Sequence, residues 1–280
     1  MSSQLSIRRI ATKDGEMITG MDATLEIAKG NILGHSSVLK FGRAPSGIQT
    51  TATDVWDRAD ATPTQSVWTA PTTARIHAIV SSNIADSDTG GVNPQGGGAR
   101  TLRVFGLTGW GANEVSEDIV MDGTTAVNTV NSYVIIHRMR VLTKGGTNVN
   151  VGIITATAAT DGTVTAQINV GEGQTQMAIY GIPSTQIAYM TSYYTSINKA
   201  QGAVAALNVN LVVNPEPDAE LTNFLVKNTQ GVQSNGTGHF QHFFNPYFKI
   251  AGPSIVKVSA TSNTADVEAS SGFDLILVTN

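Results

Sequence analysis

The sequence predicts an all-β protein built from two antiparallel β-sandwich, jelly-roll-like domains that follow an extended N-terminal arm. Runs in which apolar and polar residues alternate recur along most of the chain, and a period of two is what a strand with one buried face produces. Turn-forming residues separate these runs at roughly the spacing of a sandwich. The 3.6-residue period of an amphipathic helix is missing from these runs. These three observations favour β-sandwiches over a helical fold.

The composition constrains the size of the protein and its partners. A chain of 280 residues is long enough for two domains of roughly 100 to 150 residues each. Charged residues make up 14% of it, against roughly 25% in an average soluble domain, so uncharged polar residues and glycine must cover much of the surface. Such a surface is easily dehydrated, which favours contact with other subunits. The net charge of −4 gives no field that would attract nucleic acid or an anionic membrane.

The chain has no cysteine, which excludes disulfides and thiolate chemistry. Its N-terminus lacks the apolar core of a signal peptide, and no stretch approaches 18 apolar residues. We therefore expect synthesis in the cytosol without a Sec signal.

A short glycine-containing segment, residues 171–173, is expected to join the two domains. Before it, the apolar side chains of residues 164–170 fall on the even positions; after it, the larger side chains of residues 187–193 fall on the odd positions. Both patterns predict strands. The expected divisions are residues 1–47 for the arm, 48–173 for the first sandwich and 174–280 for the second.

The arm differs from the rest of the chain. Its only candidate elements, residues 2–10 and a short helix or strand at residues 21–29, carry few core-sized side chains. The first 43 residues contain six Lys or Arg and four Asp or Glu, which makes this segment slightly basic. We expect the arm to pack on another protein.

Strands of the first domain can be placed by the side chains that each should bury. Residues 115–121 should form a strand that leads into Asp122–Gly123, a strong hairpin signal. Arg138 and Arg140 share the opposite face of the longest strand with apolar residues, so both of its faces should be partly covered. The expected buried rows are Ile76, Ala78 and Val80; Leu102 and Val104; and Tyr133, Ile135, His137, Met139 and Val141.

Strands of the second domain follow the same pattern. One strand should end at residues 214–218, where two prolines remove backbone donors. The last strand has apolar residues on both faces, which is typical of a central strand. An aromatic cluster lies at residues 240–248. The expected buried rows are Leu207, Val209, Leu211 and Val213; Val256 and Val258; and Phe273, Leu275 and Leu277.

Two motifs resemble parts of catalytic or phosphate-binding sites. Residues 34–38 begin like a nucleophile elbow, but Val38 occupies the position of the second glycine that the turn requires. We interpret this segment as the start of a strand. The glycine-rich residues 90–98 form a long flexible loop without the Gly-Lys-Ser/Thr of a P-loop.

Three further groups could bind a metal or act as acids. His239 and His242 should lie on opposite faces of a strand without a nearby third ligand. Residues 86–90 offer the first two acidic positions of a calcium loop and lack the later ones. Glu216, Asp218 and Glu220 could supply paired carboxylates, but in a proline-rich turn we expect them to be solvated.

The remaining candidates are aromatic or imidazole side chains. His137 should be a hydrogen-bonded histidine of the core or of an interface. Trp56, Trp68 and Trp110 could stack on sugars but are more typical of a core or an interface. We therefore predict no catalytic, cofactor-binding or metal-binding residue, no cofactor and no enzymatic activity.

Several segments taken together resemble a family of tailed-bacteriophage virion structural proteins. Each segment alone could be an ordinary strand with its turn, so the resemblance rests on the set. The segments are GHSSVLKFGRAP (34–45), DVWD (54–57), GARTLRVFGL (98–107), DGTTAVNTVNSYVIIHRMRV (122–141) and SSGFDLILVTN (270–280).

The resemblance implies a particle component of antiparallel β-sandwiches, trimeric and without a cofactor. Its expected partners are further copies of itself and the capsid or tail proteins of the same virion, which is assembled in the host cytoplasm. We expect it to decorate the capsid or attach to the tail through self-association and docking of the arm. The alternatives are a receptor-binding module that grips host glycan through Trp110 or residues 240–248, and a depolymerase.

Overall fold

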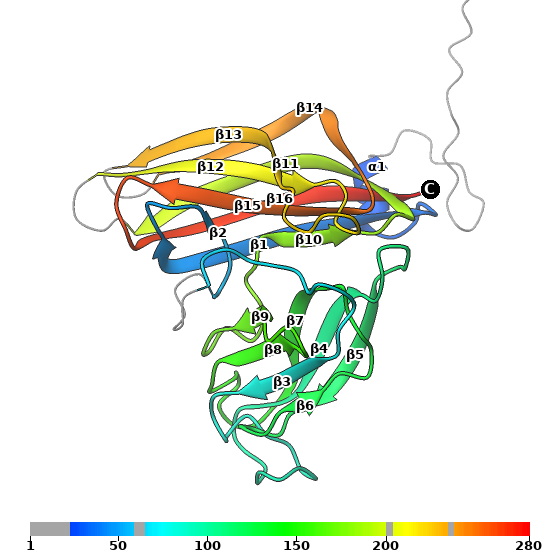
Figure 1. The fold of residues 1–280 in the computed structure, drawn as a ribbon, viewed down its shortest axis with the longest axis vertical. Coiled ribbons are helices and arrows are strands. Elements are labelled where there is room, and N and C mark those ends of the chain that lie inside the picture. The colour runs from blue at the N-terminus through cyan, green and yellow to red at the C-terminus, as the bar shows by residue number, and fades with distance from the viewer. Residues whose placement is uncertain (1–22, 59–64, 200–203, 235–237) are drawn as a thin grey trace, which may run out of the picture.

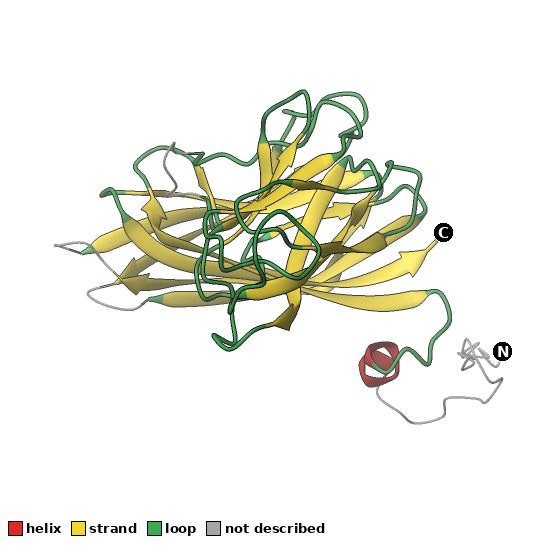
Figure 2. Ribbon diagram, turned by 90° about the horizontal axis from the view of Figure 1, so that it is seen from below, coloured by secondary structure: helices red, strands yellow, loops and turns green. Residues whose placement is uncertain are grey.

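The computed structural model describes residues 23–58, 65–199, 204–234 and 238–280. Strands make up 57% of the structure, and the helix in the described part, α1 (Ala23–Ala28), has six residues. Figure 2 shows α1 at the periphery of the strands. The prediction of an all-β, antiparallel protein is confirmed. The strands are β1 (His35–Ile48), β2 (Thr53–Asp54), β3 (His77–Ser81), β4 (Ala99–Leu107), β5 (Val115–Val120), β6 (Val127–Asn128), β7 (Ile135–Lys144), β8 (Ile154–Ala158), β9 (Val164–Ile168), β10 (Ile179–Ile182), β11 (Gln186–Lys199), β12 (Ala205–Asn214), β13 (Leu225–Ser234), β14 (His239–Ala251), β15 (Ser254–Ser262) and β16 (Val267–Thr279).

The strands form four antiparallel sheets. One has the order β1-β16-β11-β14, and a second has the order β10-β15-β12-β13, with β2 paired to β15. The other two have the orders β6-β3-β8-β9 and β5-β4-β7. In Figure 1 the first two sheets make up the upper part of the molecule and the last two the lower part. The chain enters the lower part after β2 and leaves it after β9.

This pairing differs from the expected division of the chain. Residues 35–47 were expected in the arm, but they lie in β1, which pairs with β16 from His35 to Ile48. The inward positions of β1 are Lys40, Gly42 and Ala44, whereas Leu39 and Phe41 point outward. This polarity is the reverse of an ordinary strand, so the alternation of side chains does not indicate that the strand beginning near residue 35 belongs to the core of a sheet. Residues 1–22 lie outside the described residues.

The clearest alternating patterns are confirmed. Every residue of the row from Leu207 to Val213 in β12 is buried, and β12 ends at Asn214 before the two prolines. The row that starts at Tyr133, just before β7, is buried as far as Met139, its last member Val141 is partly buried, and Arg138 and Arg140 are exposed. The last strand, β16, lies between β1 and β11 and is central, as expected.

Other expectations about facing were wrong. In β3 the buried residues are His77, Ile79 and Ser81, whereas Ala78 and Val80, which were expected to point inward, are only partly buried. In β11 a bulge beside Thr191 shifts the register, so the buried row moves from even to odd positions along the strand. A bulge reverses the alternation and hides the pattern. The turn at Asp122–Gly123 exists, but β5 and β6 on its two sides belong to different sheets and form no hairpin.

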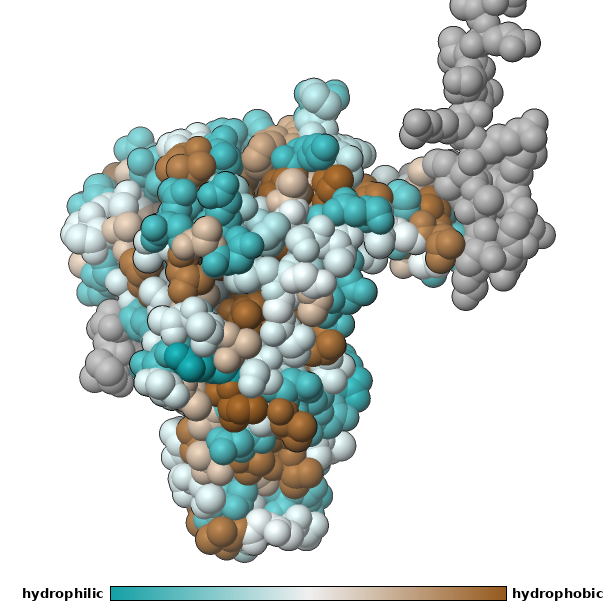
Figure 3. Space-filling view, turned by 45° about the vertical axis from the view of Figure 1, so that its right-hand side comes forward, coloured by the Kyte–Doolittle hydropathy of each residue, from teal (hydrophilic) through white to brown (hydrophobic). Residues whose placement is uncertain are grey.

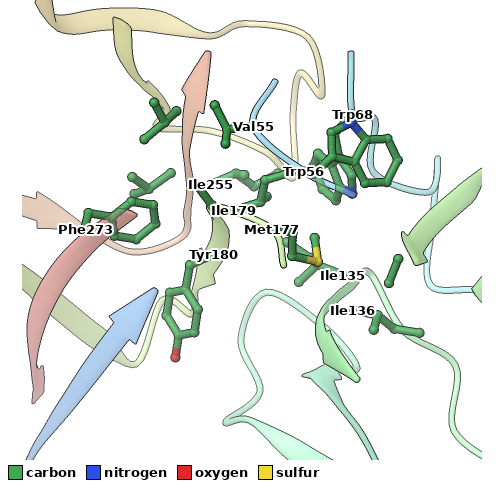
Figure 4. Packing of buried hydrophobic residues seen from close by; sticks show 14 of the residues in the cluster. Val55, Trp56, Trp68, Ile135, Ile136, Met177, Ile179, Tyr180, Ile255 and Phe273 are labelled. Carbon is green, nitrogen blue, oxygen red and sulfur yellow. The ribbon is translucent and has the colours of Figure 1, made fainter. Parts of the chain in front are cut away.

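One cluster of buried apolar residues runs through the upper and lower parts. Figure 4 shows Met177, which precedes β10, near Ile135 of β7, in the same cluster as Trp56, which follows β2. At Gly181 of β10 an added Cβ would lie 2.8 Å from Cγ2 of Ile135. The absence of a side chain there allows β10 to pack directly on β7. The upper and lower parts are therefore joined by packing as well as by the chain.

Candidate functional site

A hollow in the described part of the chain lies where β1 faces β7. It has a volume of about 570 Å³. A second hollow of about 210 Å³ adjoins it, since Leu39, Lys40 and Arg138 line both. Residues of both the upper and the lower sheets line each of the two hollows. The larger hollow is lined by Leu39, Lys40, Phe41, Arg138, Gln174, Thr175, Tyr194 and Asp274.

Lys40 brings a positive charge into this region from the inward face of β1. Its side chain is 8% exposed, and Nζ donates a hydrogen bond to the backbone oxygen of His137. Burial lowers the pKa of Lys40 to about 7, and repulsion by Arg138 adds to the shift while Glu114 opposes it. A carbonyl cannot neutralise an ammonium group, so Lys40 is a buried cation without an ion-pair partner among the described residues.

His137 forms the floor of the smaller hollow. Its Nε2 lies 2.6 Å from Oε2 of Glu114, and its ring lies 4.5 Å from the ring of Tyr180. Burial lowers the pKa of His137 even though Glu114 favours the charged form. Nδ1 is buried and has no hydrogen-bond partner in the structure, which fits a neutral ring that donates through Nε2 to the carboxylate. This agrees with the interpretation of His137 as a hydrogen-bonded core histidine.

Arg138 and Arg140 cover the outer face of β7. Their guanidinium carbons lie 5.6 and 5.8 Å from the ring centre of Phe105, and Arg138 also donates to Oε1 of Gln174 at 3.2 Å. The salt bridges of the described residues include neither arginine. By contrast Arg103, on the neighbouring strand β4, forms an ion pair with Asp118. The face of β7 next to the hollow therefore carries unpaired positive charge.

The DVWD segment (54–57) is buried and connects neighbouring parts of the structure through its side chains. Asp54 pairs with Lys257 of β15, and its Oδ2 also accepts the backbone N–H of Trp68 at 2.8 Å. Residues 169–178, between β9 and β10, form the returning segment, in which the chain passes back to the upper sheets. Trp56 forms a β-bridge with Met177 of this segment, and Oδ2 of Asp57 accepts the backbone N–H of Gln176 at 2.8 Å. All four side chains of the segment are buried. The segment thus has a clear structural role where the chain passes between upper and lower sheets.

The structure places the calcium-loop candidate in a structural role. Asp86 is fully buried, and its oxygens accept hydrogen bonds from Ser81 Oγ and from the backbone N–H groups of Ala99, Val151 and Gly152, at 2.6 to 2.8 Å. A carboxylate with four donors has no lone pair left for a cation. We expected the following glycine-rich loop to be flexible. In the structure the carboxylate of Asp122 accepts hydrogen bonds from the backbone N–H groups of Val92 and Asn93 in this loop.

The other candidates do not come together. His239 and His242 lie on β14, where the ring of His242 contacts those of Tyr193 and Phe244. Among the described residues no three His, Cys, Asp or Glu side chains are close enough to hold a metal ion. Glu216, Asp218 and Glu220 are exposed in the turn after β12. Trp56 and Trp68 are buried, and Trp110 is partly buried against the core.

The hollow itself was not anticipated from the sequence. Lys40 and Asp274 lie in different strands and are separated by most of the chain, so no local motif joins them. Arg138 was recognised as an outward residue of its strand but not as part of a site. In the part of the chain that the structure describes, no helix is long and apolar enough to span a membrane. No protein-family model matches the sequence, and no curated protein matches it either.

Proposed function

We propose that this chain is a non-enzymatic structural protein of a tailed-bacteriophage virion, which decorates and stabilises the capsid or attaches to the tail. It would act by symmetric self-association, as a trimer, and by docking of its N-terminal arm on a neighbouring virion protein, after assembly in the host cytoplasm. The four sheets would then serve as two jelly-roll-like sandwiches, each formed by two facing sheets.

The observation that carries the proposal is the pair of outer strands of the β1-β16-β11-β14 sheet. Among the residues that the structure describes, each of these long strands has one edge without a neighbouring strand in its sheet. Each also exposes large apolar side chains: Leu39 of β1 is 77% exposed and Phe243 of β14 is 67% exposed. Monomeric proteins usually protect such edges with charges or short strands. Exposed apolar edges are what a partner subunit would cover.

The rest of the surface is compatible with assembly. Figure 3 shows apolar patches among weakly polar residues on one side of the molecule. Charged residues are only 14% of the chain, so dehydrating such a surface costs little. Permanent interfaces of this kind commonly bury more than about 2,000 Å².

Light scattering coupled to size-exclusion chromatography tests the proposal on the full chain. We expect an oligomer for the wild type and a shift toward monomer for Phe243→Lys or Leu39→Lys. Val130→Lys is the matched control, because Val130 is an exposed apolar residue away from these strands. A wild-type chain that stays monomeric at high concentration and does not bind virions would contradict the proposal.

A further inference from the structure

Three exposed cations of β7, which we call the basic row, line one hollow. Arg138, Arg140 and Lys144 form this row, and the hollow beside them has a volume of about 370 Å³. None of the three takes part in a salt bridge of the described residues. The guanidinium carbons of the two arginines lie 5.6 and 5.8 Å from the ring centre of the same phenylalanine, Phe105. Like charges held this close repel each other, so a negative partner would stabilise the row.

The carboxylates around the basic row are already engaged. Two of them act on its arginines only over a longer distance than an ion pair, and a third lines the same hollow. Each has another partner: Glu114 is bonded to His137, Asp118 is paired with Arg103, and Glu172 is paired with Arg43. The positive charge of the row is therefore left for a group outside this face.

A turn of the same chain, which we call the acidic turn, carries the opposite charge. Glu216, Asp218 and Glu220 follow β12 and are exposed, and the salt bridges of the described residues include none of them. The shape of the turn is fixed, because Pro217 is buried and the backbone oxygen of Glu216 accepts the N–H of Glu220 at 2.9 Å. A turn that is already ordered loses little conformational freedom when it binds.

We propose that the acidic turn of one copy docks on the basic row of a second copy. Within one chain the turn lies between β12 and β13 in the upper part and the row on β7 in the lower part (Figure 1), and no ion pair of the described residues joins them. The arginines suit this contact because their planar forks bind carboxylates through two hydrogen bonds.

This inference rests on the self-association proposed above and adds which surfaces meet. The turn and the row are different patches, so the contact between two copies is heterologous. Heterologous contacts build rings of identical subunits when the rotation closes, and a cyclic trimer requires such a contact. Complementary charge also selects the correct orientation during assembly. The apolar strand edges would then supply burial, and the charges would decide which face meets which.

A charge swap on the full chain tests the contact, with light scattering coupled to size-exclusion chromatography as the readout. One variant has Glu in place of all three residues of the basic row, and a second has Arg in place of all three residues of the acidic turn. Each should need a concentration at least about tenfold higher than the wild type to assemble, because like charges then meet. The chain with all six substitutions should assemble with itself again. It should not co-purify with a tagged wild-type chain, since every mixed contact would join like charges.

Neutral variants and salt test the same contact without reversing a charge. Arg140→Gln should weaken self-association by about tenfold. Arg103→Gln is the matched control, because Arg103 lies directly opposite Arg140 on β4 but is already paired with Asp118. This control should assemble like the wild type. The wild-type oligomer should also weaken as NaCl rises from roughly 0.05 to 0.5 M, since salt screens exposed charges.

The outcomes separate this inference from the proposed function. Equal effects of the two neutral variants, or a folded six-substitution chain that stays monomeric, would overturn the docking. A wild-type oligomer that neither salt nor any of these substitutions weakens would overturn it too, and would leave self-association through the strand edges in place. A wild-type chain that is monomeric at low salt would contradict both. Circular dichroism shows which variants are folded, and if a reversed chain is not, the neutral variants and the salt series still decide.

Discussion

Lys257 and Asp54 form a buried ion pair across 203 residues of sequence, with Nζ of the lysine 2.6 Å from Oδ2 of the aspartate. The ammonium group also lies 4.1 Å from the ring centre of Phe224. The pair joins β2 to β15 at the point where the chain leaves the upper sheets. Both side chains are almost fully buried, so each charge depends on the other.

Removing one member of this pair should destabilise the protein strongly. Asp54→Asn leaves the Lys257 ammonium buried without a counter-ion, which should lower the free energy of unfolding by about 3–5 kcal/mol. Lys257→Met should have a similar effect. The double variant should cost less than the sum of the two single variants, because it leaves no unpaired charge. Urea unfolding at pH 7 measures all three.

The exposed pair of Arg103 and Asp118 is the control, since Arg103→Gln should cost less than about 1 kcal/mol. If the costs at Asp54 and Lys257 are simply additive, the two charges do not depend on each other as proposed.

The stability of the protein should rise with pH between about 7 and 10 because of Lys40. Its pKa is about 7 in the folded chain and about 10.4 in an unfolded chain. Between these values the unfolded state binds more protons, so the free energy of unfolding increases with pH. Below pH 7 both states carry the proton, and the buried charge has its full destabilising effect.

The other titratable groups around Lys40 should not cause a rise in stability between pH 7 and 10. The pKa of His137 is lowered and that of Tyr180 is raised, both mainly by burial, while the hydrogen bond with His137 lowers the pKa of Glu114 against the effect of burial. Lys40→Met should therefore make the free energy of unfolding depend less on pH. The gain in melting temperature of this variant over the wild type should be largest near pH 6. Thermal unfolding at pH 6 to 9 measures this slope. Equal slopes for both proteins would show that Lys40 does not titrate in this range.

Asp86 should be essential for stability and should not bind a cation. Asp86→Asn places an NH₂ group among N–H donors, which should cost about 3 kcal/mol because buried donors lose their acceptor. Millimolar calcium should leave the melting temperature of the wild type unchanged. Asp88→Asn is the control, since Asp88 lies in the same loop but accepts only exposed hydrogen bonds. A calcium-induced rise in melting temperature that Asp86→Asn abolishes would contradict this assignment.

The fold could be predicted from the sequence where the alternation is regular and the buried residues are large. The row from Leu207 to Val213 meets both conditions, and its strand lies where expected. In the middle of β1 the buried positions are Lys40, Gly42 and Ala44, while the large apolar Leu39 and Phe41 are exposed, so the buried residues there are not large apolar ones. The strand was therefore assigned to the arm, and the pairing of the N-terminal strand with the C-terminal one was missed.

The candidate site could not be predicted, because its residues come from strands that only the tertiary fold brings together. Arg138 lies on β7, and Asp274 lies on β16 in the other part of the molecule. Sequence patterns report which face of a strand is buried, but not which outward faces meet. The DVWD segment was noticed as a motif, and only the structure explains it, through the partners of Asp54 and Asp57.

Gly42 should be intolerant of any side chain, because the returning segment crosses β1 directly above it. A Cβ at Gly42 would overlap the backbone at Ala178 and Val55, and Ala178 donates to the backbone oxygen of Val55 at 2.9 Å in this crossing. Gly42→Ala should therefore lower the free energy of unfolding by at least about 2 kcal/mol, since backbone atoms cannot move aside as a flexible side chain could. Gly231→Ala, in β13, is the control, because nothing lies within 4 Å of its added Cβ. It should be neutral or slightly stabilising, since it reduces the freedom of the unfolded chain. Urea unfolding compares the two variants, and similar midpoints would mean that the crossing at Gly42 is looser than the structure indicates.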